Sequence, residues 1–111
     1  QDEQPNYFIR DLKNSGKIAQ ITNFPNPYPM LKGIQKQILK YRRNDGVELS
    51  ATLYLPAGYK KEDGPLPTFM WAYPVEFKTK EAASQVSGSP YTFTRIGWGS
   101  AVYWVTQGYA I

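Results

Sequence analysis

Two stretches decide how this chain is interpreted: PLPTFMWAY at residues 65–73 and QGYAI at residues 107–111. The last six residues of the first stretch are apolar without alternation, which is typical of a central strand covered on both faces. In the second stretch, Gly108 suits the C-terminal end of a helix, and the three residues after it begin another strand. A helix is therefore predicted over residues 101–107, with Ser100 as its N-cap. Because nothing follows this last strand, we expect a chain that stops in the middle of a fold.

A β-hairpin is predicted ahead of these stretches and is the most regular pattern in the chain. Residues 47–55 (VELSATLYL) alternate between an apolar face and a face of Glu, Ser, Thr and Tyr, and a period of two predicts a half-buried strand. Residues 35–42 (QKQILKYR) are its partner, and Asn44-Asp45-Gly46 supplies the turn. A polar loop at 56–67, with three prolines and two glycines, leads into the central strand.

A shorter hairpin is predicted at residues 6–12 (NYFIRDL) and 17–24 (KIAQITNF), with Asn14-Ser15-Gly16 as its turn. Its pattern is similar to one hairpin of a β-propeller blade, although any β-hairpin has the same features. Residues 25–31 (PNPYPML) carry three prolines, which fix φ and remove amide donors, so an extended linker is expected. The domain boundary is placed here, which gives one unit at 1–29 and a second at 30–111.

Composition excludes several kinds of chemistry. The 111 residues contain no cysteine and no histidine. Disulfides, thiolate metal sites and cysteine nucleophiles are therefore excluded, as is a Ser-His-Asp triad built from this chain alone. Histidine ligation of a metal is excluded as well, and neither a metal nor an organic cofactor is expected.

Charge and hydropathy point away from nucleic acids and membranes. Thirteen basic and nine acidic residues give a net charge of +4, and Lys40, Arg42 and Arg43 form a tight basic group around Tyr41. A nucleic-acid footprint is denser, so this group is interpreted as a solvated hairpin tip. No run approaches the roughly 18 apolar residues of a membrane span, and the polar start QDEQPN is not a signal peptide. The compartment stays open, with a periplasmic or other extracytoplasmic location slightly favoured.

Residues 75–97 form a long irregular excursion, of a length that suggests a function or a surface for a partner. Thr79 is a candidate cap for a short helical turn through Ala83. Glu76 and Glu81 are either active-site residues or simply exposed to solvent. Four aromatic residues in and around the excursion are interpreted either as packing or as a binding surface: Trp71, Trp98, Tyr103 and Trp104.

The order of these segments resembles a known family. The hairpin, SATLYLPAGY (50–59), PLPTFMWAYPVEF (65–77), a long loop, a helix and QGYAI resemble the start of the catalytic domain in prolyl oligopeptidase-type serine peptidases. The stretch WAYPVEFKTKEAASQVSGSP (71–90) most resembles the glutamyl-endopeptidase-like branch and its bacterial relatives, including proteins related to dipeptidyl peptidase IV. The resemblance covers residues 7–111. It implies the N-terminal fragment of an α/β-hydrolase domain, mostly antiparallel strands with one short helix, preceded by a β-propeller hairpin.

The resemblance implies one functional residue, Tyr73, which matches the family's oxyanion tyrosine. Its phenol O–H would donate to the oxyanion that develops on the substrate carbonyl, and one such donor is typically worth roughly 3–4 kcal/mol. Pro74-Val75-Glu76 departs from the glycine-rich turn of some members, which leaves the direction of the hydroxyl open. No G-x-S-x-G motif is present, so no nucleophile or triad residue is assigned, and Ser87, Ser89 and Ser100 are interpreted as loop and cap residues.

The sequence thus predicts a fragment of a serine peptidase that hydrolyses peptide bonds by acyl transfer and is inactive on its own. The partner of the full-length parent is a peptide substrate, with dipeptidyl, prolyl and glutamyl specificity all open. Unpaired strand edges predict self-association of the fragment. The alternative is a non-enzymatic, β-rich binding module that uses the aromatic and basic surface around residues 41–43. A third interpretation is an esterase-like hydrolase, which would lack the propeller hairpin.

Overall fold

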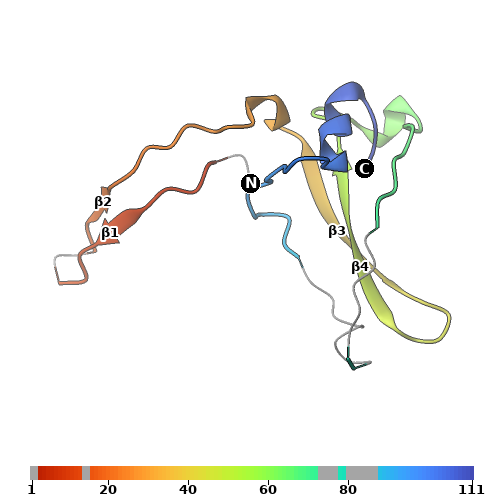
Figure 1. The fold of residues 1–111 in the computed structure, drawn as a ribbon, viewed down its shortest axis with the longest axis horizontal. Helices are drawn as coiled ribbons and strands as arrows, with labels where there is room; N and C mark the ends of the chain where they lie inside the picture. The colour runs from red at the N-terminus through yellow and green to blue at the C-terminus, as the bar shows by residue number, and fades with distance from the viewer. Residues whose placement is uncertain (1–2, 14–15, 73–77, 80–87) are drawn as a thin grey trace.

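In a computed structural model of the chain, the structure is described for residues 3–13, 16–72, 78–79 and 88–111. Figure 1 shows that two short strands near the N-terminus form an arm that stands away from the other elements. We call residues 3–27 the arm and residues 28–111 the body. The elements described are β1 (Phe8–Arg10), β2 (Ile18–Gln20), η1 (Pro29–Leu31), β3 (Gln35–Arg42), β4 (Glu48–Leu55), η2 (Lys61–Asp63) and η3 (Ala101–Gln107), where η marks a 3-10 helix.

The most regular predicted element is confirmed, because β3 and β4 form an antiparallel hairpin in which all eight residues of each strand are paired. Gly46 makes the turn with a φ of 87°, a conformation that favours glycine, and its N–H donates to the Arg43 carbonyl at 2.8 Å. The burial expected from the alternation of β4 holds only in part. Val47, just before the strand, is buried, whereas Ala51 in its middle is exposed. The hairpin is regular in its hydrogen bonding but incompletely covered.

The last residues of the chain lie beside β4. Tyr54 and Ile111 exchange both backbone hydrogen bonds, each at 2.9 Å, as an antiparallel pair does. On the other side, Ala110 forms a parallel bridge with Thr68, and its carbonyl accepts the Phe69 N–H at 2.8 Å. The order of the segments across the sheet is therefore β3, β4, residues 110–111 and residues 67–69.

The central strand predicted at residues 68–73 is present only in part. In the portion that the structure describes, Thr68 forms the bridge, and Met70 and Trp71 are 89% and 62% exposed. The prediction that this strand is covered on both faces is therefore wrong for the described residues. An open groove separates the segment from η3. Tyr73 lies outside the described residues, as does most of the helical turn predicted from Thr79.

The predicted helix is found at the predicted residues, but as the 3-10 helix η3. Ser100 occupies the N-cap position without a side-chain hydrogen bond, so the capping role predicted for its hydroxyl is wrong. Gly108 does end the helix: its φ of 86° is left-handed, and its N–H donates to the Val105 carbonyl at 3.3 Å. No helix among the described residues is long and apolar enough to cross a membrane.

A small core joins η1, β4 and η3. Leu31, Ile34 and Val105 are buried together, and Val105 is only 1% exposed. Because Leu31 belongs to this core, the proline-rich stretch does not remain extended to its end. Pro29 stands at the start of η1, where its fixed φ favours a helical turn. Partly buried side chains pack around the core: Tyr28, Tyr54, Ile96 and Ile111.

The arm has no core. Its predicted hairpin is present, but β1 and β2 pair over only three residues each, and no described residue between 3 and 27 is buried. The side chain of Asn6 closes the base of the hairpin, where its Oδ1 accepts from Thr22 Oγ1 at 2.9 Å and from the Phe24 N–H at 2.7 Å. The extended arm explains why the radius of gyration is 18.0 Å, compared with about 13 Å for a compact chain of this length.

Candidate functional site

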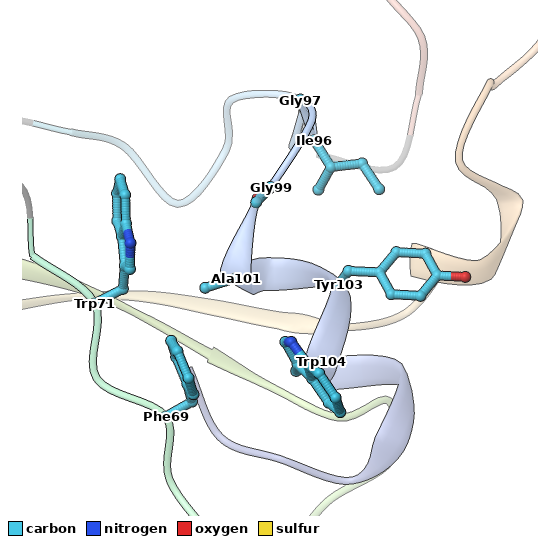
Figure 2. Close-up of a pocket in the computed structure, with 9 residues that line it drawn as sticks. Phe69, Trp71, Ile96, Gly97, Gly99, Ala101, Tyr103 and Trp104 are labelled. Carbon is cyan, nitrogen blue, oxygen red and sulfur yellow. The ribbon is translucent and has the colours of Figure 1, made fainter.

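An open groove of about 430 Å³ lies between η3 and the segment 67–72. In Figure 2, Phe69 and Trp71 extend from that segment, Trp104 extends from η3, and Ile96 comes from the loop before η3. We call this the aromatic groove. Its remaining lining residues are Gly97, Gly99, Ser100, Ala101 and Tyr103.

Backbone pairing positions the strand side of the aromatic groove. The Phe69 N–H is bonded to residue 110, which fixes this part of the segment against the rest of the sheet. Trp71 is two residues further on, and alternate residues of an extended chain leave the same face. Both rings therefore reach the groove.

Packing positions the helix side. Val105 is the buried residue of η3, whereas Tyr103 and Trp104 in the same helix are half exposed. The Trp104 ring meets the Tyr109 ring edge-on, with centroids 5.7 Å apart and planes at 72°. Such a pair contributes about 0.5–1.5 kcal/mol beyond the area that it buries. Trp104 is thus held against the turn that follows η3.

Three of the four aromatic residues singled out in the sequence line the groove: Trp71, Tyr103 and Trp104. Trp98 does not line it and is fully exposed. The sequence interpretation missed Phe69 and Ile96. Phe69 stands two positions before Trp71, so the period of a strand would have identified it. Ile96 comes from an irregular loop, and no pattern in the sequence points to it.

The aromatic groove suits apolar groups rather than ions. None of its lining side chains carries a carboxylate, an amine or a guanidinium. Within the described part of the chain, no group of three or more His, Cys, Asp or Glu residues could hold a metal ion. Among the described residues, the groove is therefore a largely apolar surface whose polar side-chain groups are the hydroxyls of Ser100 and Tyr103 and the indole N–H groups of Trp71 and Trp104. Glu76 and Glu81, like Tyr73, lie outside the described residues.

The basic group at the hairpin tip is largely neutralised by its neighbours. Arg42 forms an ion pair with Glu48 at 2.7 Å, and Arg43 forms a two-bonded pair with Asp45. The hydrogen bond from the Arg43 guanidinium lowers the pKa of the Asp45 carboxyl to about 2. Two of the three basic side chains, Arg42 and Arg43, are therefore paired with carboxylates of the same hairpin. This pairing favours the interpretation of the basic group as a solvated hairpin tip, and not as a binding surface.

A polar contact fastens the loop before η3 onto β3. Lys36 Nζ donates to Thr92 Oγ1 at 2.8 Å and to the Thr92 carbonyl at 3.3 Å, and it lies 5.9 Å from the centre of the Tyr54 ring. Burial lowers the pKa of Lys36 and raises the pKa of Tyr54. One lysine thus ties the loop that carries Ile96 to the hairpin.

Comparison with known proteins finds two relatives. A protein of Arabidopsis thaliana named "Probable glutamyl endopeptidase, chloroplastic" is 56% identical over 96 residues, which are 86% of this chain and 10% of that protein. A protein of the same name from Oryza sativa subsp. japonica is 54% identical over 110 residues, which are 98% of this chain and 12% of that protein. The chain therefore spans about a tenth of the length of these relatives. No protein-family model matches the chain, and no solved structure matches it.

Proposed function

We propose that this chain is a segment of a serine peptidase that hydrolyses peptide bonds by acyl transfer, and that Tyr73 is an oxyanion donor. The observation that carries the proposal is the identity of 56% and 54% to two proteins that bear the name of a glutamyl endopeptidase. Identity at this level over nearly the whole chain supports descent from a common peptidase ancestor. Among the three specificities left open by the sequence, the name of these two relatives favours cleavage at glutamyl residues.

The order of the strands supports an α/β-hydrolase domain as the scaffold. After β4, the chain continues to residues 67–69, which do not pair with β4 directly. It then returns through η3, and residues 110–111 pair between β4 and residues 67–69. A parallel pair joined by a crossover connection is typical of α/β sheets, and open α/β sheets bind ligands outside the carboxyl ends of their strands. Tyr73 follows the carboxyl end of residues 67–69 in the sequence, which supports a role at the substrate.

The proposed chemistry of Tyr73 is hydrogen bonding to developing negative charge. A phenol O–H aimed at the carbonyl oxygen of the scissile bond stabilises the tetrahedral intermediate more than the ground state. Loss of one such donor typically lowers kcat by roughly 10²–10³-fold. The donor works with a nucleophile and a base, and this chain has no histidine to serve as that base. The 111 residues on their own are therefore proposed to be inactive.

The arm fits the proposal as the last hairpin of a β-propeller, with the boundary to the hydrolase domain at residues 29 and 30. The supporting argument is physical. A hairpin that pairs three residues in each strand, with none of its described residues buried, is not stable by itself and suits a piece of a larger assembly of sheets. The unpaired edges of β1 and β2 would pair or pack within that assembly.

Activity-based labelling tests the class of enzyme. The full-length protein that carries this sequence would be treated with a fluorophosphonate probe, which reacts with activated serine nucleophiles, and then assayed on peptides with Glu, Gln or Pro before the scissile bond. We expect labelling of the full-length protein, none of the 111-residue chain, and cleavage that the probe abolishes. Cleavage that survives the probe but stops with a metal chelator would overturn the proposal.

A further inference from the structure

Residues 25–29, where the arm meets the body, have restricted backbone freedom, and we call them the connector. Residues 25–29 alternate proline with Asn26 and Tyr28, and each proline fixes its own φ and restricts the residue before it. The Tyr28 N–H donates to Asn26 Oδ1 at 2.8 Å, which holds the backbone between the prolines in a turn. The backbone between the arm and Tyr28 therefore has few freely rotating bonds.

The side chain of Tyr28 reaches across to the loop before η3. Its ring stacks on Phe93, with centroids 6.2 Å apart and planes at 24°. Its phenol O–H donates to the Ile96 carbonyl at 2.9 Å, a contact between residues 68 positions apart. Tyr28 also packs against the core formed by residues 31, 34 and 105. One side chain thus joins the connector, the core and the loop.

The loop that Tyr28 holds is part of the aromatic groove. Ile96 lines the groove directly. The same loop is fastened to β3 by Lys36 through Thr92, and its Gly88 lies so close to Ile38 that an added Cβ would stand 3.2 Å from it. The earlier part of the loop is therefore fixed to β3, and the end that lines the groove is fixed by Tyr28.

We propose that Tyr28 is a latch that couples the position of the arm to the shape of the aromatic groove. It is a positioning residue: its O–H sets the place of the Ile96 backbone, and Ile96 sets one edge of the groove. When the arm swings, the stiff connector carries Tyr28 with it and either keeps or breaks the bond to Ile96. This coupling concerns the groove and the arm, and it does not depend on peptidase activity.

The test uses Tyr28→Phe, which keeps the ring stacking and the packing and removes the O–H donor alone. Tyr59→Phe is the matched control, because the Tyr59 O–H also donates to a backbone carbonyl, that of Gly64, at 2.8 Å. Tyr59 stands in the loop after β4, outside residues 25–29, and does not line the groove. Equal thermal melting of the two variants would establish that they differ by position and not by stability.

Two measurements on the chain read the arm and the groove separately. Spin labels at Lys17→Cys and Lys40→Cys report the distance from arm to body, and the chain has no other cysteine. In a Trp98→Phe background, acrylamide quenching of fluorescence reports the groove alone, since the two remaining tryptophans, Trp71 and Trp104, both line it. Removal of one hydrogen bond should change the ratio of molecules with the loop released from Tyr28 to molecules with the loop held by roughly 2- to 10-fold.

With Tyr28→Phe we expect a broader distance distribution and stronger quenching together, and with Tyr59→Phe we expect neither. A broader distribution without a change in quenching would overturn the coupling, because the arm would then move without the groove. Unchanged readouts in Tyr28→Phe, or equal changes in both variants, would overturn the proposal as well.

Discussion

The two hairpins of this molecule have the same local chemistry but differ in what covers them. The arm and the β3–β4 hairpin are both antiparallel, and both turns contain a glycine with positive φ, Gly16 and Gly46. The β3–β4 hairpin pairs eight residues in each strand, gains residues 110–111 along β4 and packs on the core. The arm pairs three residues in each strand, and none of its described residues is fully buried. The comparison teaches that packing, and not turn chemistry, separates a stable hairpin from a marginal one.

The arm nevertheless has one apolar face, as strands that pack against other elements do. In the register of β1 and β2, Ile9 stands opposite Ala19. Tyr7 and Ile21, joined by a backbone hydrogen bond of 2.9 Å, lie two positions away on the same face. All four residues of that face are exposed. An apolar face on a two-stranded ribbon is stabilising only when something packs on it, and this face is exposed among the described residues.

The largest expected effect comes from the same substitution made in each region. Leu31→Ala removes a core side chain that is 5% exposed and should lower the free energy of unfolding by about 2–5 kcal/mol. Leu12→Ala removes a leucine of the arm that is 86% exposed and should change it by less than about 0.5 kcal/mol. Urea denaturation followed by circular dichroism measures both. Similar losses for the two variants would mean that the arm is packed in solution.

A smaller effect is expected where the backbone of the body needs glycine. Gly108→Ala places a side chain at a φ of 86° with open space around it. The free energy of unfolding should therefore fall by roughly 1–2 kcal/mol, through conformational strain alone. Gly97→Ala also enters open space, but at an ordinary φ, and should be neutral within about 0.5 kcal/mol. Thermal melting of the pair separates strain from contact. A neutral Gly108→Ala would show that η3 does not end in the left-handed turn.

The two regions should also respond differently to Thr→Val. Thr94 is 7% exposed, and its Oγ1 has no hydrogen-bond partner among the described residues, so Thr94→Val should stabilise the body by about 1 kcal/mol. In the arm, Thr22 Oγ1 accepts from the Tyr7 N–H and donates to Asn6, each at 2.9 Å. Thr22→Val should therefore speed amide exchange at residue 7 without changing the melting temperature. Destabilisation by Thr94→Val would reveal that its hydroxyl has a partner.

The smallest effect concerns the ion pair at the tip of the body's hairpin. The pKa of Asp45 is lowered from 3.8 to about 2, so its contribution to stability is complete above pH 4 and is lost as the pH falls towards 2. Because Asp45 is exposed, salt should weaken this contribution further. Carboxyl chemical shifts followed by NMR would give the pKa, and Arg43→Gln should return it towards 3.8. An unshifted pKa in the parent chain would mean that the pair does not form in solution.

The sequence was sufficient where the determinants are local. The period of two over residues 47–55, the turn at Gly46 and the helix end at Gly108 each follow from conformational preferences of a few neighbours. The aromatic groove was only partly predictable, because Ile96 reaches it through contacts with Tyr28 and the core, which lie far away in the sequence. The same reason explains Met70 and Trp71, whose apolar character predicted coverage that this chain does not supply.

The measurement that tests the proposed function most directly is the steady-state hydrolysis of a Glu-containing peptide by the full-length protein and its Tyr73→Phe variant. Tyr91→Phe is the control, since Tyr91 is 84% exposed and lies in the excursion after Tyr73. We predict that Tyr73→Phe lowers kcat by roughly 10²–10³-fold with little change in KM, while Tyr91→Phe keeps the parent's kcat. An unchanged kcat in Tyr73→Phe would contradict the assignment of this residue as the oxyanion donor.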